Sequence, residues 1–153
     1  MLGFFKYWGP VVAFMALIFV GSTDWLSGNS TGRFLVPLNK FFLPAADESL
    51  VNGIRLVIRK IGHLTEYAIL AMLLWRALTF SGQPVGAGRV GWSPRIAFLA
   101  WLSASLYAVS DEFHQSFVPS RVGSPVDVII DSAGAGIAII VLFIFRHKIL
   151  QSE

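Results

Sequence analysis

Carboxylates, histidines and cations gather at three places in this sequence, with apolar residues between them. A histidine beside a carboxylate is the usual pair for moving protons, and buried carboxylates acquire the shifted pKa values that general acids and bases need. Arginine and lysine close by would suit a phosphate group. The three groups are Arg59, Lys60, His63, Glu66 and Tyr67; Asp111, Glu112, His114 and Gln115; and Arg121, Asp127 and Asp131.

Each residue type suggests its own role. We predict that His114 and Asp111 form the general acid–base pair. Asp127 would orient that pair or act as a second base, and His63 is a further catalytic candidate. The predicted ligand-binding residues are Arg121 and Lys60, for a phosphate, together with Arg59, Glu66, Tyr67, Glu112, Gln115 and Asp131.

The same side chains include suitable metal ligands, namely His63, His114 and the carboxylates. However, neither histidine lies in a recognised zinc motif, and Lys60 would repel a cation. The chain has no cysteine, which excludes a cysteine-ligated zinc centre and a disulfide framework. We therefore favour acid–base chemistry over a metal centre and assign no cofactor.

The surroundings of these groups follow from the composition. The chain has 153 residues, enough for one domain. It is 55% hydrophobic and 14% charged, whereas about one-quarter of the residues in a soluble domain are charged. This difference excludes intrinsic disorder and predicts a single membrane domain, residues 1–153, with the lipid bilayer as its main partner. The twelve basic residues are scattered, so nucleic-acid binding is not expected.

Four stretches approach the length of about 20 apolar residues that a transmembrane helix needs. The sequence predicts an all-α integral membrane protein, a bundle of four transmembrane helices. Apolar residues at 34–43 predict an interfacial or re-entrant first loop. A cleaved signal peptide is the alternative for the first stretch, which lacks an A-x-A-like cleavage site. The predicted spans are about 7–26, 56–75, 96–115 and 126–145.

Three of these stretches can cross a membrane only by taking polar residues with them. The uncharged run between Arg95 and Asp111 covers about 23 Å of helix, less than the roughly 30 Å hydrocarbon core. Because successive helices alternate in direction, the polar ends of all four, with Asp24 of the first, should lie on one side. The third helix is expected to turn one polar stripe inward, consisting of Ser103, Tyr107, Asp111, His114 and Gln115. In the fourth helix, Ser132, Gly134 and Gly136 predict close helix packing.

The charges also predict an orientation. Of the nine acidic residues, only Glu153 lies at the end opposite the polar groups. Arg59, Lys60 and Arg121 can pair with those acids, and once they are set aside the remaining cations favour the side of the two termini. We predict a multi-pass protein with cytoplasmic termini and its polar cluster on the extracytoplasmic side.

Several of these segments resemble the VanZ-like family, from about residue 8 to residue 145. Ser120 stands where that family commonly has Gly, and Asp131 where Asn is frequent. The second departure adds a negative charge to the site. The resemblance is carried by Lys60-Ile-Gly-His63 with Glu66-Tyr67, Ser110-Asp-Glu-Phe-His-Gln-Ser-Phe-Val-Pro-Ser-Arg121, Ser124-Pro-Val-Asp127 and Asp131-Ser-Ala-Gly-Ala-Gly136.

The resemblance implies a small multi-spanning protein of the bacterial cytoplasmic membrane. The namesake of the family is associated with resistance to the glycopeptide teicoplanin, but the resemblance supplies no reaction. Together with the polar groups it predicts a site that acts on or binds an envelope lipid or lipid-linked glycan, with glycopeptide tolerance as one outcome. The alternatives are a non-catalytic protein that binds an envelope precursor, a purely structural charge network, and an ion or proton pathway.

Overall fold

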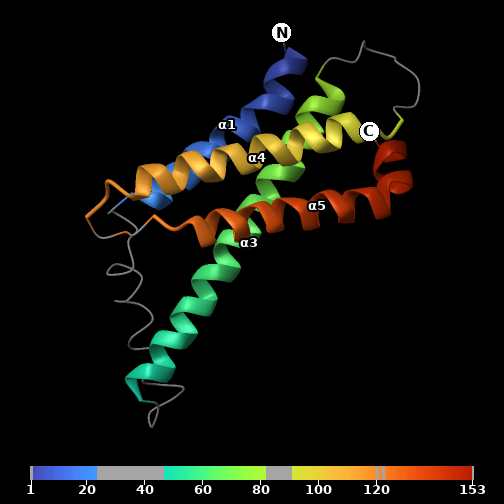
Figure 1. Cartoon of the computed structure of the whole chain (residues 1–153). Coiled ribbons are helices and arrows are strands. Elements are labelled where there is room, and N and C mark those ends of the chain that lie inside the picture. The colour runs from blue at the N-terminus through green and yellow to red at the C-terminus, as the bar shows by residue number, and fades with distance from the viewer. Residues whose placement is uncertain (1, 24–46, 82–90, 120, 122, 153) are drawn as a thin grey trace.

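The computed structural model describes residues 2–23, 47–81, 91–119, 121 and 123–152, and over these residues it is all-helical, with no strand (Figure 1). The prediction of an all-α chain is therefore confirmed for this part. The predicted first loop, Asp24 and Ser120 lie outside the described residues. The four helices are α1 (Leu2–Ser22), α3 (Glu48–Phe80), α4 (Pro94–Gln115) and α5 (Pro125–Ser152).

Helix α3 is the centre of the arrangement and packs against each of the other three helices. Figure 1 shows α4 and α5 running in opposite directions, with α3 crossing them and its first turns projecting beyond the others. The helix has 33 residues, and at 1.5 Å per residue it is about 50 Å long. The helix extends well beyond the predicted 56–75. Charged residues such as Glu48 and Arg55 lie outside the apolar stretch, but they are good helix formers and so allow the helix to continue.

Side-chain contacts at both ends establish how the helices run. At one end, the hydroxyl of Ser22, the last residue of α1, lies 3.4 Å from Nδ1 of His114 near the end of α4. At the other end, the aromatic rings of Tyr7, Trp75, Phe80, Trp92 and Phe143 stack or meet edge to face, with neighbouring centroids 5.4 to 6.1 Å apart. We call this set the aromatic end. The starts of α1 and α4 thus meet the ends of α3 and α5 there.

Small residues allow the helices to approach closely, as predicted for α5. A Cβ at Gly134 would overlap the backbone carbonyl of Leu64 in α3. In α4 the buried face consists of Ala97, Ala100, Ala104 and Ala108, and continues to Asp111 and Gln115. Small residues at helix interfaces are the usual basis of packing in membranes, where lipid supplies no hydrophobic force between helices.

The outer surface of the bundle is apolar on every helix. Large hydrophobic side chains are at least half exposed on each, among them Phe5 and Leu17 of α1, Leu56 and Ile61 of α3, Phe98 and Phe113 of α4, and Ile129 and Ile144 of α5. A soluble monomer rarely exposes so much contiguous apolar surface. This surface is the kind that lipid would cover.

Two helices in the described part of the chain are long and apolar enough to cross a membrane, within α1 (Phe4–Ser22) and α5 (Pro125–His147). Only 11% of the first segment and 28% of the second are buried, so neither resembles the enclosed core helix of a soluble protein. These segments suggest a membrane protein, although by length and composition alone the first would also suit a signal sequence. Helices α3 and α4 do not meet the same criterion because their charged and polar residues lower their hydropathy.

Candidate functional site

The buried charged and polar side chains, apart from Thr79, gather at the end opposite the aromatic rings. Among these buried residues are His63 of α3, Asp111, Glu112 and Gln115 of α4, and Asp127 and Asp131 of α5. Tyr67, one turn after His63 on the same face of α3, is fully buried. We call these seven residues the polar cluster. Three helices contribute to it, each through the polar end of a buried face that is otherwise apolar.

Asp127 joins the start of α5 to α3 through two cations, Arg59 and Lys60, which lie at the rim of the polar cluster. It lies in the first turn of α5, where the helix dipole favours a negative charge. Its Oδ2 accepts a hydrogen bond of 2.8 Å from Arg59, and its Oδ1 pairs with the ammonium of Lys60. Asp127 is 1% exposed, while Arg59 and Lys60 are 40% and 28% exposed. The two predicted ligand-binding cations therefore reach toward the surface while sharing one buried acid.

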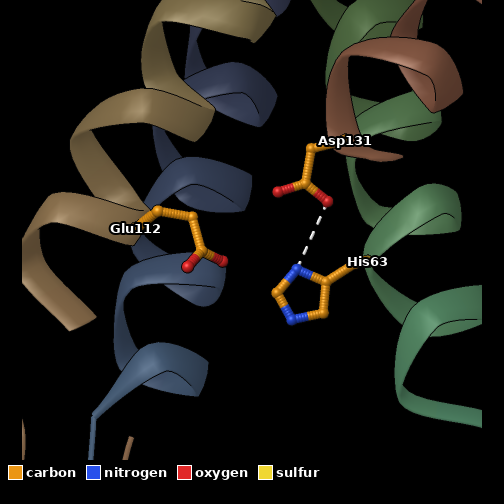
Figure 2. Close-up of side chains that lie close together, drawn as sticks. All are labelled: His63, Glu112 and Asp131. Atoms are coloured by element: carbon orange, nitrogen blue, oxygen red, sulfur yellow. Dashed lines mark ion pairs between the residues drawn. The ribbon is translucent and has the colours of Figure 1, made fainter. Parts of the chain in front are cut away.

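Deeper in, His63, Glu112 and Asp131 face one another from α3, α4 and α5. Figure 2 shows the imidazole and the two carboxylates pointing toward a common space. Nδ1 of His63 lies 3.3 Å from Oδ1 of Asp131, yet their orientation does not form a hydrogen bond. One ligand atom from each of the three residues lies within 4.8 Å of the others.

The polar cluster carries more hydrogen-bonding capacity than it uses among the described residues. Seven buried atoms lack a hydrogen-bond partner there: Nδ1 of His63, the hydroxyl of Tyr67, Oδ1 of Asp111, Oε1 of Glu112, Oε1 of Gln115 and both carboxylate oxygens of Asp131. An unpaired buried polar group costs about 1–3 kcal/mol, and a charged one costs more. In a native protein each such group calls for an explanation, such as strain, a catalytic role or a bound water or ion.

The remaining bonds of the cluster fix the α4–α5 connection. Nε2 of Gln115 donates to Oδ2 of Asp111 at 2.9 Å, one helical turn away. The backbone N–H of Ser124 donates to Oε2 of Glu112 at 2.7 Å. These two bonds leave Oδ1 of Asp111 and Oε1 of Glu112 without a hydrogen-bond partner among the described residues.

Arg121 lies in the same connection and is half-buried. Its guanidinium donates to the carbonyl of Gly21 near the end of α1 at 2.8 Å, where the helix dipole favours a cation. Burial and, less strongly, the charge of Arg59 lower the pKa of Arg121, whereas nearby carboxylates of α4 raise it. The guanidinium is therefore within electrostatic reach of the polar cluster.

Two predicted site residues are not among the buried residues of the cluster, although Glu66 is within electrostatic reach of His63, Asp111 and Asp131. His114 is half-buried and faces α1, with its ring 4.6 Å from that of Phe19 between centroids. Among the described residues, no hydrogen bond joins His114 to Asp111, the pair expected to exchange protons. Glu66 is exposed. In the predicted stripe of α4, Ser103 is exposed as well, because the alanines rather than the serines turn toward the neighbouring helices.

The structure also adds participants that residue type alone did not indicate. Ser22 is buried and contacts His114, and the backbone of Ser124 holds Glu112. Tyr107 donates its hydroxyl to the carbonyl of Met15 at 2.7 Å and so joins α4 to α1. The position of Ser22 at the end of an apolar stretch could have indicated its role. No sequence signal marks the backbone N–H of Ser124 or the carbonyl of Met15.

A family model described as VanZ/LLP1 matches residues 7–146. The chain belongs to the VanZ/LLP1 family. The match runs from α1 into the last turns of α5 and includes every residue of the polar cluster. Searches among curated proteins and among solved structures gave no match.

Within this VanZ/LLP1 protein, the chemistry on offer is that of an imidazole flanked by carboxylates. His63 can carry a proton, Asp131 can orient its ring, and Glu112 and Asp111 present free oxygens to the same interior. The cations at the rim can attract an anion. His63 thus holds the position beside carboxylates that the sequence suggested for His114.

Proposed function

We propose that this VanZ/LLP1 protein spans the bacterial cytoplasmic membrane four times, with both termini inside and the polar cluster at the outer face. There it binds and acts on the phosphate-bearing headgroup of an envelope lipid or lipid-linked glycan. The observation that carries the proposal is an inverted distribution of polarity. Apolar side chains cover the outside of all four helices, while the buried end holds four carboxylates.

Membrane insertion of all four helices is supported by their exposed surfaces. An ionisable group at membrane depth costs several kcal/mol unless it faces partners or water. Helix α3 turns His63 inward and α4 turns Asp111 and Glu112 inward, while both helices present large apolar side chains outward. Part of the low hydropathy of these two helices therefore comes from buried residues that would not meet the lipid.

A ligand is supported by the unused bonds of the polar cluster. A network that only held the helices together would pair its members, as Asp127 is paired with Arg59 and Lys60. Asp131 instead has neither oxygen hydrogen-bonded to a described residue, although it is fully buried. Such a carboxylate is costly to a merely structural network and useful to a binding or acid–base site.

A headgroup carrying phosphate is supported by the cations at the rim. Arg59 and Lys60 are partly exposed beside the cluster, and Arg121 lies in the adjoining connection. A lipid lying along the apolar flank of α3 or α5 could place its phosphate at these residues while its tail stays in hydrocarbon. Asp111, Glu112 and His63 would then face the bonds next to that phosphate.

The test is to purify the protein with native lipids and identify the retained polyprenyl phosphates and glycerophospholipids by mass spectrometry. The retained species are then incubated with wild type, Lys60→Gln and Asp111→Asn. Lys6→Gln serves as a matched control, because Lys6 is exposed at the opposite end of the bundle. We expect Lys60→Gln to lower headgroup retention and Asp111→Asn to lower product formation.

The result also separates catalysis from binding. Product from wild type that disappears in a folded Asp111→Asn variant supports an enzyme. Retention of a headgroup that never yields product supports the non-catalytic binding protein instead. If wild type neither retains nor converts any polyprenyl phosphate or glycerophospholipid above the level of bulk lipid, the proposal is wrong.

A further inference from the structure

The contact between His63 and Asp131 has a spacing that also suits two ligands on one ion. Zinc binds nitrogen and oxygen at about 2.0–2.2 Å, so two ligands of a tetrahedral site lie about 3.4 Å apart. The observed separation of Nδ1 and Oδ1 is 3.3 Å. Both atoms are buried and neither has a hydrogen-bond partner among the described residues.

Glu112 completes the set from a third helix. It is 4% exposed, and its Oε1 has no partner among the described residues while Oε2 is held by the N–H of Ser124. Figure 2 shows its carboxylate turned toward His63 and Asp131. Because the fixed oxygen orients the carboxylate, the free oxygen is supplied in a defined direction, as outer partners do for metal ligands.

The charge of the cluster also favours a cation. Asp127 is balanced by Arg59 and Lys60. Asp111, Glu112 and Asp131 are also buried, with Arg121 within electrostatic reach of the first two and Lys60 within reach of Asp131. The four buried carboxylates of the cluster face three cations, Arg59, Lys60 and Arg121, so at least one negative charge remains, and in low dielectric it must be neutralised by a proton or by a bound ion.

We propose that His63, Glu112 and Asp131 bind one divalent transition-metal ion. One imidazole nitrogen and two carboxylate oxygens suit Zn²⁺ or Mn²⁺ better than Mg²⁺, which prefers oxygen ligands and retained waters. Three protein ligands leave a coordination position open, as in catalytic zinc sites. A phosphate oxygen could occupy that position. This last step rests on the proposed function, whereas metal binding itself does not.

The experiment uses the full chain with a non-histidine affinity tag. Detergent-purified protein is stripped with chelator, exchanged into metal-free buffer and titrated with Zn²⁺ by calorimetry, and the bound metal is counted by elemental mass spectrometry. We expect about one Zn²⁺ per chain, together with a rise in melting temperature. Excess Mg²⁺ should not displace it.

Matched variants locate the site. His63→Gln and Glu112→Gln should each weaken Zn²⁺ binding roughly tenfold or more. His147→Gln and Glu48→Gln make the same chemical changes at exposed positions outside the cluster and should bind as wild type does. Asp131→Asn keeps the shape and one oxygen donor while removing a charge, so it should weaken binding less than His63→Gln.

Wild-type protein that is monodisperse and helical but takes up no Zn²⁺ or Mn²⁺ overturns the metal site without any variant. Full stoichiometry in a folded His63→Gln variant overturns it as well. Lipid retention is measured separately in metal-free buffer, so loss of the metal proposal leaves the headgroup test readable. A protein that binds zinc but retains no lipid would reject the proposed function alone.

Discussion

Gly134 of α5 lies so close to the backbone of Leu64 in α3 that the Cβ of any other residue would overlap the Leu64 carbonyl. Leu64 follows His63, and Gly134 follows Asp131 by almost one turn. The glycine therefore sets the distance between the two helices at the level of the His63–Asp131 contact.

Replacing that glycine should loosen both the packing and the site. Gly134→Ala is expected to destabilise the fold by about 1–3 kcal/mol, the usual cost of forcing atoms into a well-packed interface. Gly136→Ala is the control, since its Cβ would lie at an ordinary 3.6 Å from the indole nitrogen of Trp101. The measurement is thermal unfolding of both variants in the same detergent. Equal melting temperatures would contradict the close contact.

The shared pairing of Asp127 predicts unequal effects of its partners. Lys60→Ala should cost about 1 kcal/mol because Arg59 still pairs with the carboxylate, and both cations are partly exposed. Asp127→Ala should cost about 2–4 kcal/mol, since it removes the acid that both cations share at the start of α5. Denaturant unfolding of the two single variants and of the double variant measures the coupling. A Lys60→Ala effect as large as that of Asp127→Ala would show that Arg59 contributes nothing.

Two tyrosines, the buried Tyr67 and the half-buried Tyr107, should separate stability from function. The Tyr107 hydroxyl bonds to Met15, so Tyr107→Phe should cost about 1 kcal/mol and loosen α1. The Tyr67 hydroxyl is buried without a partner among the described residues, so Tyr67→Phe should leave stability unchanged or raise it. Tyr67→Phe should nevertheless reduce headgroup retention or turnover. Thermal unfolding and the lipid assay, run on both variants, check the two halves of the prediction.

The start of α3 provides a pH-dependent cap. Asp47 accepts a hydrogen bond from the N–H of Leu50 at 2.8 Å. That bond and a second from the Ser49 hydroxyl lower the pKa of the Asp47 carboxyl from 3.8. A depressed folded pKa means that the stabilisation is present above the unfolded pKa and is lost as the pH falls through the folded value. Protection of the Leu50 amide from hydrogen exchange should therefore hold at neutral pH and decline below about pH 4.

Substitutions at the same cap separate its charge from its geometry. Asp47→Ala should remove the protection of Leu50 at all pH values, while Asp47→Asn, which also caps helices, should retain most of it without the pH dependence. A decline of the same size in Asp47→Asn would assign the pH effect to another group.

The proposed orientation can be tested directly because the chain has no cysteine. Gly53, on the projecting part of α3, and Gly91, beside the start of α4, both have open space where a side chain would go. Gly53→Cys should react with a membrane-impermeant thiol reagent in whole cells, and Gly91→Cys should react only after the membrane is opened. The reverse pattern would place the polar cluster inside. Equal labelling would show that the two positions are not separated by a membrane.

The sequence predicted the helices well where apolar character and helix coincide. The predicted 96–115 differs from α4 by two residues at its start. The predicted span of 56–75 is shorter than α3, because its length was taken from the thickness of the bilayer. The residues from Glu48 to Arg55 continue the helix beyond that length. Pattern alone does not show how far a helix projects beyond its apolar part.

The candidate site was harder to predict because its geometry depends on helix rotation. His114 and Asp111 are neighbours in sequence, yet Ala100, Ala104 and Ala108 decide which face of α4 approaches the other helices. Asp111 lies on that face and His114 does not. His63, Glu112 and Asp131 come from three separate helices. Their spacing along the sequence therefore could not predict that their ligand atoms lie close together.

The aromatic end has a consequence for how the molecule can be used. Trp75 contacts both Phe80 and Trp92, and Trp92 contacts Phe143, so rings from several elements meet where the buried faces finish. Among the described residues, no ionisable side chain is buried at this end. The described residues therefore offer no chain of buried ionisable groups that could carry a proton or ion from Asp127 to the aromatic end. In the proposed membrane arrangement, a substrate and its product would therefore enter and leave the polar cluster from the same leaflet.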